Sequence, residues 1–119
     1  MPQLAITERR VGGVTILALA GRLVLDEGDA PLRERIDALA REGRIDLVLN
    51  LHDISFIDSS GIGTIVGKFV SLRRRGGHLK LVCPSMRCRH VLEITHLLPV
   101  FQVFETDEAA VESFSAVAH

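Results

Sequence analysis

Short apolar runs alternate with helical patterns from one end of the chain to the other. Residues 4–11 alternate apolar and polar positions, and residues 14–19 form a second apolar run of the kind found in strands. Gly12-Gly13 stands between the two runs and is typical of a hairpin turn. The pattern therefore predicts two antiparallel strands at the start of a sheet.

After the predicted hairpin, apolar residues recur at the spacing of a helix. In the first helical segment Asp29 can cap the helix, Pro31 suits its first turn, and Gly43 ends it. A second segment spans residues 60–75 and stops at Gly76-Gly77. Further strands are predicted at 46–51, 78–83 and 100–104, and further helices at 85–95 and after a cap at Thr106.

Two strands followed by repeated helix–strand units indicate an α/β fold. Crossovers of this type give parallel central strands, so we expect a mixed β-sheet of four to five strands packed by about four α-helices. With 119 residues and no linker or internal repeat, the chain is predicted to be a single domain, residues 1–119.

Composition narrows the classes of function. The net charge of −1 gives no broad electrostatic attraction for nucleic acid, and without Trp and Tyr few aromatic rings are available to stack on bases. Nucleic acid is therefore not expected to be a partner. No apolar run approaches the roughly 18 residues of a membrane span, which argues against direct membrane insertion. No secretion signal is visible, and two cysteines suit a reduced state, so a cytoplasmic location is expected.

The candidate chemistry lies in Asp58-Ser59-Ser60-Gly61, between a predicted buried strand and a predicted helix. Free N–H groups at a helix N-terminus favour an anion, and a hydroxyl on this turn would be accessible to another protein. A phosphate there would add about 1.5 to 2 negative charges beside Asp58. The same four residues are also an ordinary capping sequence, and composition alone leaves both interpretations open.

A dinucleotide site is the first alternative. Gly61, Gly63 and Gly67 form a G-x-G-x-x-x-G pattern, one residue longer than the usual fingerprint. The next strand, which ends near Cys83, also lacks the acidic residue that would hold a ribose. We therefore expect Gly63 and Gly67 to permit close packing against a neighbouring element.

Catalysis and metal binding are also poorly supported. Neither Ser59 nor Ser60 has a glycine two positions before it, as a nucleophile elbow requires. Cys83, Cys88 and His90 form a C-x4-C-x-H pattern, which is not a zinc spacing. The chain is therefore predicted to have no catalytic residue, no cofactor and no metal.

Several segments together resemble a known family. The Asp-Ser-Ser-Gly-Ile-Gly stretch beginning at Asp58, the residues before it, and the Gly76-Gly77 turn with its following strand resemble the anti-sigma factor antagonists, which are bacterial STAS domain proteins. The similarity extends over nearly the whole chain, so it implies a single STAS domain.

The resemblance implies a non-enzymatic binding protein that regulates transcription by partner switching. Its partner would be an anti-sigma factor, often itself a serine kinase, and Ser59 matches the position that the kinase phosphorylates. A phosphatase would reverse the modification. One departure is that Val24 stands where many family members have an acidic residue. Either Asp26 replaces it from a longer loop, or the partner differs from the usual kinase.

The partner surface is predicted to centre on the Ser59 turn. It would include the loop at residues 24–28 and the exposed face of the following helix. The residues expected to contact the partner are Asp26, Asp58, Ser59, Ser60, Gly61, Thr64 and Lys68, with Ser71 on the same face. The alternative is a STAS scaffold or accessory subunit of a signalling assembly or membrane transporter, in which the serine is only a helix cap.

Overall fold

The computed structural model describes residues 4–25, 28–83, 86–94, 96 and 100–117. These residues form five strands: β1 (Leu4–Val11), β2 (Val14–Leu23), β3 (Asp46–Ile57), β4 (His78–Val82) and β5 (Val103–Phe104). They also form four helices: α1 (Asp29–Arg41), α2 (Ser59–Arg74), α3 (Met86–Ile94) and α4 (Asp107–Val117). The predicted α/β class and the numbers of strands and helices are confirmed.

The strands form one mixed sheet in the order β1-β2-β3-β4-β5. β1 and β2 are antiparallel and joined at Gly12-Gly13, as predicted, while β2, β3, β4 and β5 pair in parallel. β3 is longer than its apolar run because it pairs with β2 as far as the Leu23–Ile57 pair. β5 has two residues rather than the five expected.

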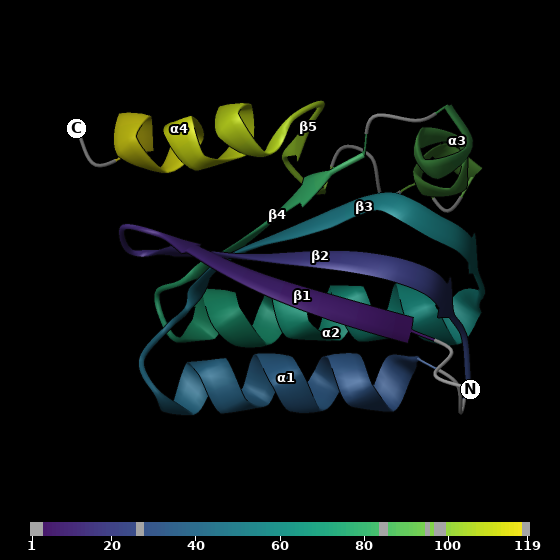
Figure 1. Ribbon diagram of the computed structural model, residues 1–119, viewed down its shortest axis with the longest axis horizontal. Coiled ribbons are helices and arrows are strands. Elements are labelled where there is room, and N and C mark those ends of the chain that lie inside the picture. The colour runs from purple at the N-terminus through teal and green to yellow at the C-terminus, as the bar shows by residue number, and fades with distance from the viewer. Residues whose placement is uncertain (1–3, 26–27, 84–85, 95, 97–99, 118–119) are drawn as a thin grey trace.

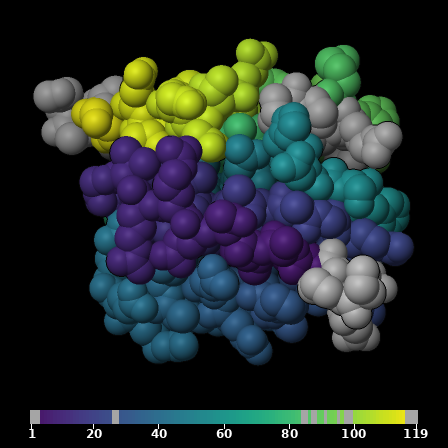
Figure 2. Space-filling view, in the orientation of Figure 1, coloured from purple at the N-terminus to yellow at the C-terminus, as the bar shows by residue number. Residues whose placement is uncertain are grey.

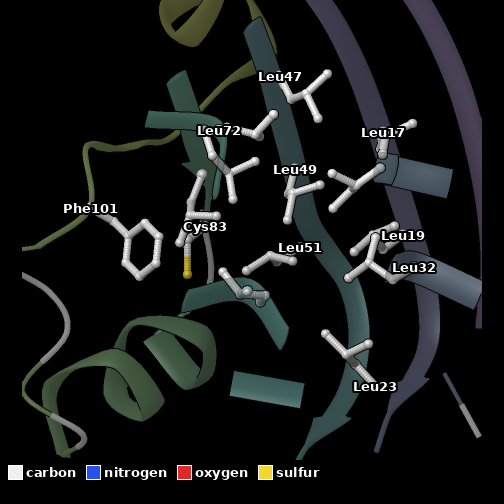
Figure 3. Close-up of a cluster of buried hydrophobic side chains, with 14 of the residues drawn as sticks. Leu17, Leu19, Leu23, Leu32, Leu47, Leu49, Leu51, Leu72, Cys83 and Phe101 are labelled. Atoms are coloured by element: carbon white, nitrogen blue, oxygen red, sulfur yellow. The ribbon is translucent and has the colours of Figure 1, made fainter. Parts of the chain in front are cut away.

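Helices cover both faces of the sheet (Figure 1). α1 and α2 lie side by side along one face, and α4 lies over the other. The main core lies between the sheet and the α1–α2 layer, where Leu17, Leu49 and Leu32 are completely buried (Figure 3). A smaller cluster, which includes Ile16 and Val48, packs against Ala110 of α4.

This architecture determines where the Ser59 turn lies. β2 and β3 run in parallel and end at the same edge of the sheet, and the chain enters α2 directly after β3. The turn therefore lies beside the end of β2, in agreement with the rule that sites in parallel sheets form beyond the carboxyl ends of the strands.

Candidate functional site: the Ser59 turn

Asp58 anchors the N-terminus of α2. Its Oδ1 accepts a hydrogen bond from the Gly61 amide at 2.9 Å, as an N-cap residue does. Its Oδ2 accepts a second bond, from the Leu25 amide at 3.1 Å. The Gly61 and Leu25 amides hold the pKa of Asp58 below its ordinary value, because both bonds favour the carboxylate. One side chain thus joins the start of α2 to the loop after β2.

Gly61 is required by a close approach of two backbones. A Cβ at this position would lie 2.3 Å from the Leu23 carbonyl oxygen and 2.9 Å from Leu23 Cγ. The same carbonyl accepts a hydrogen bond from the Asp58 amide at 3.3 Å. The turn is therefore held against the end of β2 from two sides, and a larger residue would separate them.

Ser59 is the first residue of α2 and is exposed, whereas Ser60 is half-buried. Among the described residues, none forms a hydrogen bond with the Ser59 hydroxyl. The hydroxyl is thus accessible at the positive end of the helix dipole, where a negative group is favoured. The geometry allows modification of Ser59 by another protein.

A shallow groove of about 420 Å³ separates α1 from α2 next to this turn. Its lining residues are Asp29, Arg33, Ser60, Gly63, Thr64, Gly67 and Lys68. Gly63 and Gly67 are exposed, and a Cβ at either position would meet nothing within 4 Å. The expectation that these glycines permit close packing is therefore wrong, since they form the open floor of the groove.

The predicted exposed face of α2 needs a correction. Thr64 is buried, at 7% exposure, and its Oγ1 lies 3.5 Å from the Arg33 guanidinium that donates to it. Lys68 pairs with Asp37 of α1 at 2.7 Å, which leaves 18% of its side chain exposed. Both residues face α1 because the two helices are neighbours, so they lie within the groove and not on the exposed face of α2. Ser71 is exposed, as expected.

The predicted partner-binding residues stay a prediction, and the structure shows where most of them lie. Asp58, Ser59, Ser60 and Gly61 lie together at the start of α2. Asp26 lies outside the described residues. Val24, where an acidic residue is missing, is buried.

Two exposed apolar residues lie beside the turn, and the sequence reading singled out neither of them, although Leu25 belongs to the predicted loop at residues 24–28. Leu25 is 58% exposed and Phe56 is 54% exposed, and the Arg22 guanidinium lies 5.7 Å from the Phe56 ring centre. The exposure of Phe56 could have been predicted by extending the strand to Ile57, because neighbouring residues in a strand point to opposite faces of the sheet. Leu25 carries no sequence signal, because its exposure depends on the loop.

Other possible chemistry has little support in the described part of the chain. No three His, Cys, Asp or Glu side chains there come together as metal ligands. No helix in the described ranges is long and apolar enough to cross a membrane. Cys83 is completely buried and disulfide-bonded, so the expectation of a reduced cysteine is wrong at this position.

Comparisons with known proteins agree with this description. The family model of the STAS domain matches residues 5–110. The anti-sigma-B factor antagonist of Bacillus subtilis is 37% identical over 89 residues, which cover 74% of this chain and 81% of that protein. The crystal structure of a putative anti-sigma factor antagonist from Thermotoga maritima has a TM-score of 0.84 at 28% identity, covering 91% of this chain and 92% of the other.

A third similar structure is that of a protein in a phosphorylated form. The Bacillus cell fate determinant SpoIIAA in its phosphorylated form has a TM-score of 0.72 at 26% identity, and the match covers 92% of this chain and 99% of that one.

A five-stranded mixed sheet with helices on both faces, and with the Ser59 turn at the carboxyl ends of β2 and β3, is the architecture of a STAS domain. The chain belongs to the STAS domain family, and its relatives include anti-sigma factor antagonists. Anti-sigma factor antagonists of this family are binding proteins without enzymatic activity.

Proposed function

We propose that this protein is an anti-sigma factor antagonist that binds an anti-sigma factor of the serine-kinase type. A cytoplasmic location is part of the proposal because sigma factors act there, and it does not rest on the cysteines. Phosphorylation of Ser59 releases the partner and a phosphatase restores binding, so that the protein controls sigma-factor-dependent transcription. The observation that carries the proposal is the exposed Ser59 hydroxyl at the first position of α2, on a turn held by Asp58 and Gly61.

The charge balance gives the switch its direction. A phosphate on Ser59 gains about 0.3–1 kcal/mol from the helix N-terminus at an exposed site. Burying its charge under a partner without a matching cation costs several kcal/mol, and each 1.4 kcal/mol is tenfold in affinity. The cost of burial is larger, so phosphorylation weakens binding.

Cations within the α1–α2 groove do not alter this balance. Arg33 pairs with Asp29 at 3.2 Å, and Lys68 pairs with Asp37 at 2.7 Å. Each positive charge is already matched by a carboxylate on α1. A phosphate on Ser59 therefore adds net negative charge to the surface that the partner covers.

The proposed partner surface consists of the Ser59 turn and the apolar residues next to it. Leu25 and Phe56 supply exposed apolar area, which the centre of a specific interface needs. Ser59, Ser60 and Asp58 supply the polar contacts. Thr64 and Lys68 support α1 behind this surface, and their role in binding is to keep the groove between α1 and α2 in shape.

The proposal is tested by measuring the affinity of the chain for a serine-kinase anti-sigma factor from the same host. Ser59→Ala should bind like the unmodified chain, and Ser59→Asp should bind at least tenfold more weakly. Ser115→Ala and Ser115→Asp are the matched controls, because Ser115 is exposed on α4, away from the Ser59 turn. Equal affinities of both Ser59 variants would exclude this serine from the switch.

Mass spectrometry of the protein from its host supplies a second, independent test. The chain has seven Ser, five Thr and no Tyr, so a phosphate can be assigned to one residue. An added mass of about 80 Da on Ser59, the mass of one phosphoryl group, is expected. An unmodified Ser59 under both growth and stress would instead favour the scaffold or accessory-subunit function.

A further inference from the structure

The outer edge of β1 is open along its whole length. β1 is the first strand of the sheet and pairs only with β2, so no described segment lies along its other side. In Figure 1 the strand runs along the front of the molecule, and in Figure 2 its side chains form an uncovered band between α1 and α4. Its eight residues extend over about 27 Å.

The register with β2 shows which backbone groups point outward. Val11 and Val14 close a two-residue hairpin, and such closing pairs exchange hydrogen bonds. Alternation along the antiparallel ladder then turns the N–H and C=O groups of Leu4, Ile6, Glu8 and Arg10 away from β2. Unpaired edge groups of this kind are a template for another strand.

A groove beside this edge would accept side chains from the added strand. It has a volume of about 370 Å³ and lies between β1 and α1. Its lining residues are Leu4, Ile6, Pro31, Glu34, Arg35 and Ala38. The edge thus offers backbone groups and, next to them, a partly apolar depression.

Charged residues often protect an open edge, but here their charges are matched within the chain. Glu8 contacts both Arg10, at 2.9 Å, and Arg35 of α1, at 3.7 Å. Arg10 also contacts Glu42 at the end of α1, at 3.4 Å. The charged side chains of this edge comprise three acids and three bases: Glu8, Arg9, Arg10, Glu34, Arg35 and Glu42. Because this edge carries equal numbers of acidic and basic side chains, it is electrostatically compatible with the same edge of a second copy.

We propose that this edge is an interface with a second copy of the chain, in which β1 pairs antiparallel with β1 and the two sheets become continuous. One register places Thr7 opposite Thr7 of the second copy. It lets all four outward-facing residues form hydrogen-bonded pairs, with about eight bonds in total.

This register also avoids repulsion. Leu4 lies opposite Arg10 of the second copy, and Ile6 lies opposite Glu8, so no like charges face each other directly. Moving the two-fold axis to Glu8 or Arg9 would place a charge opposite itself, which destabilises a strand pair. The Thr7 register is therefore the one that the sequence of β1 favours.

The proposed interface is small, so the dimer should form only at high protein concentration. One strand edge and one helix bury less than the roughly 800 Å² per partner of a standard interface, so we expect a Kd on the order of 10–100 μM. The Ser59 turn lies at the carboxyl ends of β2 and β3 rather than along β1. Dimerisation therefore leaves both turns accessible, and this inference does not depend on the proposed function.

Sedimentation velocity from about 5 to about 500 μM tests the inference on the intact chain. The mass should rise from 13.1 kDa towards twice that value. Thr7→Lys and Thr7→Asp should each raise the Kd about three- to fivefold, because like charges then meet at the two-fold axis. An equimolar mixture of the two variants should recover dimers. Ala18→Lys is the matched control, since Ala18 is exposed and pairs with Thr7 from β2.

A backbone variant provides a second test. Glu8→Pro removes an outward N–H without removing a bond to β2, so it should weaken the dimer at least tenfold while the circular dichroism spectrum is retained. Amide exchange at Ile6, Glu8 and Arg10 should slow as the concentration rises. The proposal is overturned by a monomer at every concentration, by a dimer that Thr7→Lys leaves unchanged, or by a lack of recovery on mixing.

Discussion

Gly61→Ala is the substitution that most directly tests how the Ser59 turn is built. The new Cβ would lie 2.3 Å from the Leu23 carbonyl oxygen, and an ordinary contact begins at about 3.4 Å. The start of α2 must therefore move away from β2 by roughly 1 Å. Overpacking of this kind costs about 2 kcal/mol, which lowers the Tm of a domain of this length by roughly 6–12 °C.

Gly63→Ala and Gly67→Ala are matched controls on the same helix. A Cβ at either position meets nothing within 4 Å, and both positions are exposed. Alanine in a helix interior is better than glycine by about 0.5–1 kcal/mol, so these variants should be more stable than the original chain. The same chemical change thus has opposite signs at positions 61 and 63.

Urea and thermal denaturation of the three variants measure this difference. Near-native stability of Gly61→Ala would refute the argument from close approach, and so would destabilisation by Gly63→Ala. A partner-binding assay adds a second readout, because displacement of α2 should also weaken binding at the Ser59 turn. Gly67→Ala should leave binding less affected than Gly61→Ala, since it lies two helical turns from Ser59.

Two further substitutions test ionisable groups through pH. Because the Gly61 and Leu25 amides lower the pKa of Asp58, its carboxylate stabilises the folded state above the unfolded pKa and loses this effect as the pH falls. Asp58→Asn should therefore flatten the acid limb of a Tm–pH curve, and an unchanged limb would contradict the assignment. Burial lowers the pKa of Lys80, so folding stability should rise with pH as the unfolded pKa is approached. Lys80→Met should abolish this rise, although it also removes the 2.7 Å hydrogen bond that Lys80 donates to Ser113.

Local chemistry made several features predictable from the sequence. Gly12-Gly13 can form a hairpin turn without help from the rest of the chain, and the structure has that turn. Thr106 caps α4 by accepting a bond from the Ala109 amide at 3.1 Å, as its position before the helix indicated. Asp58 was placed correctly at the start of α2 for the same reason.

Features that depend on neighbouring elements could not be predicted in this way. Thr64 lies on a polar side of α2, which hydrophobic spacing assigns to solvent, but α1 covers it. The length of β3 was underestimated because its polar His52 and Asp53 interrupt the apolar run, while pairing with β2 continues past them. In both cases a long-range contact overrides a local pattern, and the contact has no sequence signature.

The backbone of the Ser59 turn and the charge on its exposed side chain can be tested separately. Asp58 accepts hydrogen bonds from the Leu25 and Gly61 amides, and its own amide donates to the Leu23 carbonyl at the end of β2. The backbone of the turn is therefore fixed by bonds that do not involve Ser59. A phosphate on the Ser59 hydroxyl would break none of those bonds. A loss of partner binding on phosphorylation must then come from charge at the surface, not from a rearranged turn. For this reason the affinity of Ser59→Asp can be interpreted without a structural change, whereas that of Gly61→Ala cannot.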